Sequence, residues 1–182
     1  AGAGAVRIEI AGGGLELISI SDDGCGMSRE DACLAFERHA TSKISRAEDL
    51  FSISTLGFRG EALPSVASVA KVRLATRERG SAMGTVVIAE GSVMGQPSAI
   101  GAPEGTTIAV RDLFYNTPAR LKYLRSVATE TRRVIEAVGR LALAHPEVSL
   151  SLQVDGRNVL SAPQGGSLRE AAAAVLGVEL AR

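Results

Sequence analysis

Two acidic residues and a Gly-Cys-Gly turn follow a short apolar run in the stretch ISISDDGCGM, residues 18–27. A carboxylate at the end of a strand can accept a hydrogen bond from the exocyclic amine of adenine, and glycines beyond it let the base approach the backbone. Such an acceptor rejects guanine, because the keto oxygen of guanine would leave the carboxylate unpaired. Asp22, Gly24 and Gly26 are therefore candidate purine-binding residues. In isolation, the same stretch is also typical of an ordinary surface turn.

The spacing of this stretch excludes two other kinds of site. A calcium loop needs carboxylates at alternating positions, whereas Asp22 and Asp23 are adjacent and would point to opposite sides of a strand. A dinucleotide-binding fingerprint needs a third glycine where this chain has Arg29. The P-loop pattern G-x-x-x-x-G-K-[ST] occurs nowhere in the sequence, so a nucleotide site here must bind phosphates in another way.

Two further motifs, HATSKI at residues 39–44 and LGFRGEAL at residues 56–63, favour the nucleotide interpretation. In the second motif Gly57 and Gly60 come just before a predicted helix, whose exposed N-terminal amides and dipole would attract phosphates. The first motif adds hydroxyls and a cation at Thr41, Ser42 and Lys43. An adenine acceptor, a long loop and a phosphate-binding helix start together predict an ATP pocket without a P-loop.

Hydrophobic periodicity and capping signals predict the elements that position these groups in the first half of the chain. Alternating apolar residues, interrupted by three glycines, indicate a hairpin, and the capping box S-R-E-D at residues 28–31 indicates a helix start. We expect a β-hairpin over residues 5–21, a helix over 28–38, a long functional loop over 39–60 and a helix over 61–69.

The second half combines strands and helices. We expect strands over residues 71–77, 85–89 and 106–112, a weaker strand in 92–100, helices over 118–124 and 129–144, a hairpin over 148–161, and a last helix over 167–176. Asp155-Gly156 is typical of the type I′ turn of that hairpin. Because neighbouring strands are joined by hairpins, the predicted fold class is α+β: a two-layer sandwich of a mostly antiparallel mixed sheet with helices on one face.

Composition is typical of one globular domain, with 46% hydrophobic and 22% charged residues in a chain of 182. No apolar run approaches the roughly 18 residues that indicate a membrane span, so we expect no membrane association. The two cysteines, Cys25 and Cys33, match neither a disulfide framework nor a zinc-binding spacing.

Charge is zero overall but unevenly distributed, because residues 111–140 hold seven bases against three acids. Such an excess can bind a polyanion, although it is more often a solvated helix face. On the helix predicted over 129–144, Arg133 and Arg140 share a face, and Glu130 and Glu136 lie largely off it. Arg132 and Glu136 should form an ordinary surface pair, and the opposite, core-facing side should consist of Val134, Ile135, Val138, Leu141 and Ala142. The candidate DNA-contacting residues are Arg120, Lys122, Arg125, Arg133 and Arg140.

Four motifs in a fixed order carry a family resemblance: D-x-G-x-G, HATSKI, GFRGEAL, and GTT followed by DLFYNTPAR, which ends at Arg120. Together they resemble the MutL family of DNA mismatch repair proteins, which are GHKL (Bergerat-fold) ATPases. The resemblance extends from residue 1 to about residue 162. It implies that Asp22 accepts from adenine, that Gly24 and Gly26 shape the entrance, and that Thr106 supports the acid from a neighbouring strand. It also implies phosphate or lid contacts from Thr41, Ser42, Lys43, Gly57, Phe58, Arg59 and Gly60.

The same resemblance implies an ATP- and Mg²⁺-dependent ATPase domain over residues 1–162, followed at 163–182 by a helix towards a second domain. Family members carry a Glu-x-x-x-Asn helix before a D-A-G-A segment, whereas this chain starts at AGAGAV and has no such motif in its ATP-site region. We therefore expect no catalytic residue and no metal ligand in this chain, which would be inactive alone. The expected partners are DNA, a MutS-like mismatch-recognition protein and a second copy, in the bacterial cytoplasm near the nucleoid.

Two alternatives remain at this point. One is a nucleotide-binding or interaction module that hydrolyses nothing, and the other is a different GHKL ATPase such as a topoisomerase subunit. The motif DLFYNTPAR disfavours the second. Within that motif, Tyr115 and Asn116 are expected to end a strand and cap the next helix, or otherwise to contact DNA or a partner. In the leading interpretation, ordering of a lid over residues 39–60 by nucleotide controls dimerisation and contacts with partners.

Overall fold

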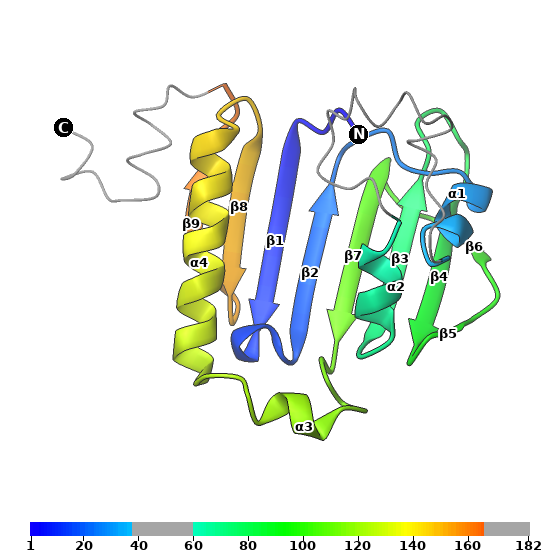
Figure 1. The fold of residues 1–182 in the computed structure, drawn as a ribbon. Coiled ribbons are helices and arrows are strands. Elements are labelled where there is room, and N and C mark those ends of the chain that lie inside the picture. Colours follow the sequence, from blue (N-terminus) through cyan, green and yellow to red (C-terminus); the bar gives the residue numbers. More distant parts are fainter. Residues whose placement is uncertain (38–59, 166–182) are drawn as a thin grey trace, which may run out of the picture.

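The computed structural model describes residues 1–37 and 60–165. In these residues nine strands form one sheet in the order β5-β4-β3-β7-β2-β1-β8-β9, with β6 also paired to β4 (Figure 1). Every pairing is antiparallel except that of β1 with β8. The strands are β1 Ala5–Ala11, β2 Leu17–Asp22, β3 Lys71–Arg77, β4 Gly84–Glu90, β5 Val93–Met94, β6 Ser98–Ile100, β7 Gly105–Arg111, β8 Ser149–Val154 and β9 Arg157–Ala162.

The helices form a second layer on one face of this sheet. Helix α4 packs on β8 and β9, α2 contacts β3 and α1 contacts β4, whereas α3 lies beyond the end of the sheet (Figure 1). The helices are α1 Arg29–Leu34, α2 Ala62–Ala67, α3 Pro118–Leu121 and α4 Val127–Ala144, and a 3-10 turn joins β1 to β2 at Gly12–Gly14. The predicted two-layer α+β sandwich with a mostly antiparallel sheet is confirmed.

Strand alternation accounts for the core, because every second side chain points towards the helices. Under α4 the buried cluster combines Ile8 and Ile10 of β1 with Leu152 of β8. Under α1 and α2 the buried clusters contain Val72 and Leu74 of β3, both fully buried. The sheet and the helix layer therefore enclose three clusters of buried, aliphatic side chains.

Helix boundaries differ from the prediction where capping side chains decide them. The hydroxyl of Ser28 accepts from the backbone N–H of Asp31, as the capping box predicts, but α1 ends at Leu34 instead of residue 38. Helix α4 begins two residues earlier than predicted, because Ser126 is its N-cap and accepts from the N–H of Thr129. Helix α3 ends at Leu121, three residues before its predicted end.

The loop that precedes α3 corrects the predicted role of Asn116. Thr117, not Asn116, occupies the N-cap of α3. The side-chain amide of Asn116 donates instead to the carbonyl of Ser68 at 2.9 Å, so it is already used at the end of α2. The ring of Tyr115 lies under the ammonium group of Lys71 at 5.4 Å, a cation–π contact that connects the same loop to β3.

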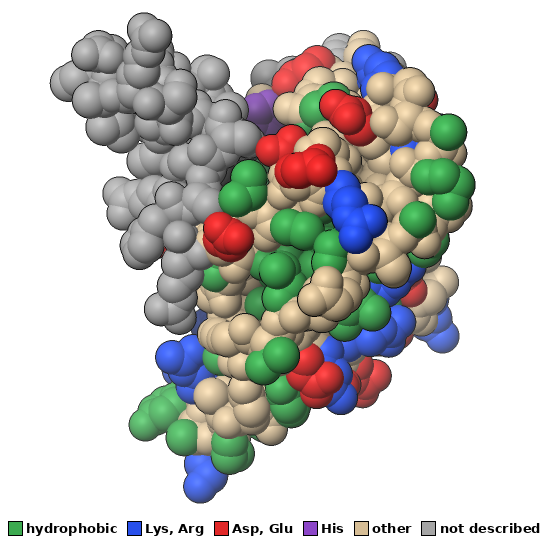
Figure 2. Space-filling view, turned by 90° about the vertical axis from the view of Figure 1, so that its right-hand side faces the viewer, with side chains coloured by type: hydrophobic (Ala, Val, Ile, Leu, Met, Phe, Trp, Pro, Cys, Tyr) green, Lys and Arg blue, Asp and Glu red, His purple; other side chains and the backbone are tan. Residues whose placement is uncertain are grey.

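The β8–β9 hairpin has the predicted turn, since Asp155 and Gly156 both have positive φ, at 48° and 78°. At the other end of the sheet, exposed hydrophobic side chains of β4 and β5 (Ile88, Val93 and Met94) interrupt a polar surface, and Figure 2 shows hydrophobic groups gathered on that side. No helix in the described part of the chain is long and apolar enough to cross a membrane. The predicted helix over 167–176 lies outside the described residues.

Candidate functional site

Three polar side chains replace apolar ones where β2, β7 and β3 meet at one end of the sheet. Asp22 is paired with Thr106, and Thr106 with Thr76, across adjacent strands. Their side chains point to the helix-covered face, because directly paired residues share a face. One step further into the sheet, the residues on this face are Ile20, Ile108 and Leu74. The helix-facing side of the sheet thus changes from aliphatic to polar at this end.

The carboxylate of Asp22 is held by its own turn. Its Oδ1 accepts from the backbone N–H of Gly24 at 2.9 Å, and the side chain is half-buried. Among the described residues, no hydrogen bond to the second oxygen, Oδ2, is present. One oxygen therefore fixes the orientation of the group while the other remains able to accept from a ligand. This arrangement fits the exocyclic amine of adenine, which is a donor.

Two glycines allow the chain to close tightly around this end of the sheet. Gly26 has φ +69°, and a Cβ atom at this position would overlap the carbonyl oxygen of Arg77. Gly105 has φ +104°, and a Cβ atom there would overlap the carbonyl oxygen of Asp22. Any larger residue would separate the turn after Asp22 from β3 and β7. The glycine at the fifth position of D-x-G-x-G is therefore required by packing within the protein itself.

The second aspartate of the motif, Asp23, has a structural role that spacing alone did not predict. Its Oδ1 accepts from the N–H of Ala5 at 2.9 Å and from the N–H of Gly4 at 2.8 Å. These bonds, first the one from Ala5, and the positive charge of Arg79 lower the pKa of Asp23 below its usual value. The side chain therefore joins the start of β1 to the turn that follows Asp22.

Thr76 was not predicted as a site residue, yet it is fully buried beside Thr106. Its hydroxyl oxygen accepts from the N–H of Met27 at 2.9 Å and lies 3.1 Å from the hydroxyl oxygen of Thr106. The sequence contains one signal for it: Thr76 continues the inward-pointing series of Val72 and Leu74 with a polar residue. A polar residue at the end of an otherwise aliphatic series marks the position where the core meets a site.

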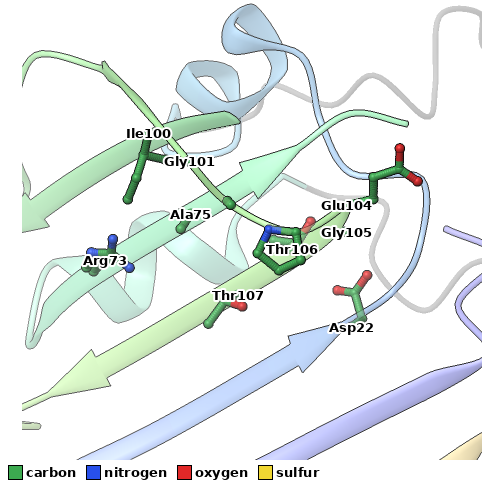
Figure 3. A pocket seen from close by; sticks show the side chains of 11 residues that line it. Asp22, Arg73, Ala75, Ile100, Gly101, Glu104, Gly105, Thr106 and Thr107 are labelled. Carbon is green, nitrogen blue, oxygen red and sulfur yellow. The ribbon is translucent and has the colours of Figure 1, made fainter. Parts of the chain in front are cut away.

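A pocket of about 190 Å³ lies at this end of the sheet (Figure 3). Arg73, Ala75 and Thr107 line it, and these residues alternate along their strands with the helix-facing Thr76 and Thr106. Asp22, Thr106 and the segment 100–105, which leads into β7, form the rest of the wall. The pocket therefore adjoins Asp22, the candidate adenine acceptor, and its partner Thr106.

The predicted phosphate and lid residues lie mostly outside the described part of the chain: Thr41, Ser42, Lys43, Gly57, Phe58 and Arg59. Gly60 is described, has φ +62° and directly precedes Glu61, the N-cap of α2. The expectation that a helix starts after this glycine is confirmed. Among the described residues, no group of three or more Asp, Glu, His or Cys side chains could hold a metal ion.

The candidate DNA-contacting residues are all exposed but spread over three segments. Arg120 lies on α3, Lys122 and Arg125 lie between the helices, and Arg133 and Arg140 lie on α4. The expectation that Glu130 lies off the face of Arg133 is wrong, because Glu130 is one turn earlier and binds Arg133 at 3.2 Å.

Two further expectations for α4 have opposite outcomes. The expected surface pair of Arg132 and Glu136 is present at 2.9 Å. Leu141 was assigned to the core-facing side but is 42% exposed, whereas Val138 and Ala142 are buried as expected. The apolar stripe of α4 is therefore narrower than the sequence suggested, because Leu141 lies outside the part of the helix that packs on β8 and β9.

The mostly antiparallel sheet, the single helical layer and the Asp22–Thr106 pair at the strand ends define a domain of the GHKL (Bergerat-fold) class. No protein-family model matches the sequence. Two curated relatives align over the whole chain: the MutL proteins of Geobacter sulfurreducens, 56% identical, and of Desulforudis audaxviator, 54% identical. Among solved structures, the Aquifex aeolicus MutL ATPase domain complexed with ADP has a TM-score of 0.73 at 31% identity, over 96% of this chain and 61% of that one.

The chain belongs to the MutL family of DNA mismatch repair proteins and corresponds to part of the ATPase domain. It covers 30% of the length of the Geobacter relative and 32% of that of the Desulforudis relative. The family that the four motifs indicated is thereby confirmed.

Proposed function

We propose that this chain binds ATP, with the adenine amine on Asp22, as part of the ATPase module of a mismatch repair protein. The observation that carries the proposal is the Asp22–Thr106 pair, in which one carboxylate oxygen is fixed by Gly24 and the other is left to accept. The solved relative with ADP supports it, since that protein has the same fold and binds an adenine nucleotide. Guanine is disfavoured because its keto oxygen offers no donor to Asp22.

Within this site, each residue has a distinct task. Asp22 selects the base, Gly24 and Gly26 let the turn pass close to it, and Thr106 supports the carboxylate from β7. When bound, Mg²⁺ would neutralise charge on the triphosphate. The described residues contain no group of three or more Asp, Glu, His or Cys side chains that could hold this ion.

Hydrolysis is the second part of the proposal. The resemblance assigns the general base and the metal ligand to a Glu-x-x-x-Asn motif that this sequence does not contain in its ATP-site region. We infer that the 182 residues alone bind nucleotide but do not turn it over, and that the ATPase reaction needs that motif in addition. Loss of a general base typically costs about 10²- to 10⁴-fold in rate.

The partners that we propose follow from the family and from surface charge. DNA is supported by the exposed bases on α3, on α4 and between them, which can track a phosphate backbone without reading sequence. A MutS-like protein and a second copy of the chain are the proposed protein partners. We also propose that the ATPase domain ends at residue 162 and is followed by a helix over 163–182. The proposed location of the protein is the cytoplasm, near the nucleoid.

The experiment that tests the proposal is the substitution Asp22→Asn in a full-length MutL-family protein that carries this 182-residue segment, called the carrier protein below. The amide can turn a donor towards the adenine amine, so a charge-assisted hydrogen bond is lost and ATP affinity should fall roughly tenfold or more. Asp155→Asn is the matched control, because Asp155 lies in the β8–β9 turn, away from Asp22. Equal ATP affinity in both variants, with unchanged circular dichroism, would show that D-x-G-x-G is only a turn.

Measuring ATP hydrolysis distinguishes the proposed ATPase from the alternative, a module that binds nucleotide without hydrolysing it. Phosphate release by the carrier protein should be measurable above background, and the isolated 182 residues should release none. Absence of turnover in the carrier protein as well, with ATP binding intact, would favour the non-hydrolysing module.

A further inference from the structure

Thr76 is the least exposed polar residue in the described part of the chain. Thr76 is fully buried, and the other buried polar side chain in the described part of the chain is Thr85, 9% exposed, which pairs with it on β4. A buried hydroxyl is costly unless it is hydrogen-bonded. Its partners therefore show which parts of the molecule it holds together.

The hydroxyl oxygen of Thr76 has three polar neighbours. It accepts from the N–H of Met27 at 2.9 Å, and it lies 3.0 Å from the carbonyl oxygen of Gly105 and 3.1 Å from the hydroxyl oxygen of Thr106. A threonine hydroxyl has one proton to donate and two lone pairs to accept. One lone pair serves Met27, and the proton serves either Gly105 or Thr106.

Each of these three neighbours lies next to Asp22 or in the turn that follows it, and so belongs to the proposed nucleotide site. Met27 follows Gly26, the glycine that closes against β3. Gly105 lies against the carbonyl of Asp22, and Thr106 is paired with Asp22. Thr76 is thus the single side chain, among those described, that bonds both the turn after Asp22 and the start of β7.

The position of its proton also decides what Thr106 presents. When Thr76 donates to Thr106, the proton of Thr106 is free to be donated to Asp22 or to a ligand. When Thr76 donates to Gly105, Thr106 donates back to Thr76 and presents only lone pairs. Whether the hydroxyl of Thr106 donates or only accepts a hydrogen bond towards the base therefore depends on Thr76, which does not contact the base.

We propose that Thr76 is a positioning residue of the nucleotide site, which fixes the hydroxyl of Thr106 and the turn at Met27 and thereby strengthens the preference for adenine over guanine. This inference rests on the proposed nucleotide site at Asp22. Without the hydroxyl, the buried N–H of Met27 loses its partner and the hydroxyl of Thr106 loses its restraint.

The test compares Thr76→Val with Thr76→Ser in the carrier protein, with Thr85→Val as the matched control. Val has the shape of Thr without the hydroxyl, and Thr85 makes no side-chain hydrogen bond to the site in the described structure. For Thr76→Val we expect ATP affinity to fall about tenfold, the loss typical of leaving a buried donor unpaired, and the ratio of ATP to GTP affinity to fall at least about threefold. Thr76→Ser and Thr85→Val should keep both quantities within about twofold of the parent protein.

The outcomes separate this inference from the proposed function. If Asp22→Asn weakens ATP binding and Thr76→Val changes neither affinity nor the ATP to GTP ratio, the role of Thr76 is overturned and the site stands. If Asp22→Asn has no effect, the site itself is wrong. If affinity falls equally for ATP and GTP in Thr76→Val, Thr76 only stabilises the fold, and its role in selecting adenine is overturned. Should Thr76→Val fail to fold by circular dichroism, Thr76→Cys replaces it with the same expected result, because a thiol is a weak hydrogen-bonding group.

Discussion

The sheet has two halves that use the same strand alternation for different purposes. Under α4, the helix-facing residues of β1, β8 and β9 are aliphatic along most of their length and form one buried cluster. Under α1 and α2, β2, β7 and β3 begin in the same way, with aliphatic residues such as Val72 and Leu74. At one end of the sheet, however, their helix-facing positions are polar: Asp22 at the end of β2, Thr76 near the end of β3 and Thr106 near the start of β7.

The difference shows how one sheet can combine a hydrophobic core with a cluster of polar side chains, the proposed nucleotide site. The first half stabilises the fold by burying apolar area, at roughly 25 cal/mol per Å². The second half has polar instead of aliphatic side chains at three positions. Hydrogen bonds hold two of them in place: Asp22 accepts from the N–H of Gly24, and Thr76 accepts from the N–H of Met27. Because these side chains lie on strands, they are held more firmly than loop residues would be.

The largest effect is expected from the aliphatic half, with Leu152→Ala. Leu152 is fully buried under α4, so the substitution should lower the free energy of unfolding by about 2–5 kcal/mol. ATP affinity at a temperature where the variant is folded should stay within about twofold of the parent, because the lost contacts lie away from Asp22. Urea unfolding and calorimetric titration measure the two quantities. A large loss of affinity would mean that the two halves are not separable.

A comparison of two glycines sharpens the account of the polar half. Gly26 and Gly80 have similar positive φ, at +69° and +81°, but only a Cβ atom at Gly26 would overlap the backbone of Arg77. Alanine at Gly80 should cost about 1–2 kcal/mol for its backbone conformation, and alanine at Gly26 about 1–3 kcal/mol more for the overlap. Unfolding titrations of both variants measure the difference. Equal losses would show that the turn after Asp22 is not held against β3.

A smaller effect is expected at Asp23, where pH provides the measurement. The pKa of Asp23 is lowered in the folded protein, so its contribution to stability is present above the unfolded value of about 3.8 and is lost as pH falls through the folded value. Asp23→Asn keeps an oxygen for the N–H groups of Gly4 and Ala5, whereas Asp23→Ala does not. At pH 7 the melting temperature should fall in the order parent, Asp23→Asn, Asp23→Ala.

The difference between the parent and Asp23→Asn should shrink as pH falls from about 3.8 through the lower pKa of the folded protein, because below that pKa the parent also carries an uncharged side chain. A difference that is independent of pH would show that the charge of Asp23 is not what stabilises the start of β1.

How far the sequence predicts this molecule depends on the kind of interaction. Alternation and capping predict the strands, the type I′ turn at Asp155 and the start of α1, because these signals are local in the chain. The pairing of Asp22 with Thr106 came from the family resemblance, and register then confirmed that they are neighbours.

Contacts between residues distant in sequence were not predictable in this way. Thr76 and Met27 are 49 positions apart, and nothing near either residue indicates the other. Asn116 shows the same limit, since its sequence position favours a helix cap and only the fold brings the carbonyl of Ser68 to it. On α4, Glu130 lies beside Arg133 although the seven-residue spacing of the arginines suggested an unshared face.

The most direct measurement of the central claim is amide hydrogen exchange of the carrier protein with and without a non-hydrolysable ATP analogue. A site at the ends of β2, β7 and β3 predicts that exchange at residues 24–27 and 104–107 slows about tenfold or more, because the bound state opens less often. Exchange in β8 and β9, under α4, should remain within about twofold of the free protein. No change at residues 24–27 and 104–107, or equal slowing in both halves of the sheet, would contradict the account.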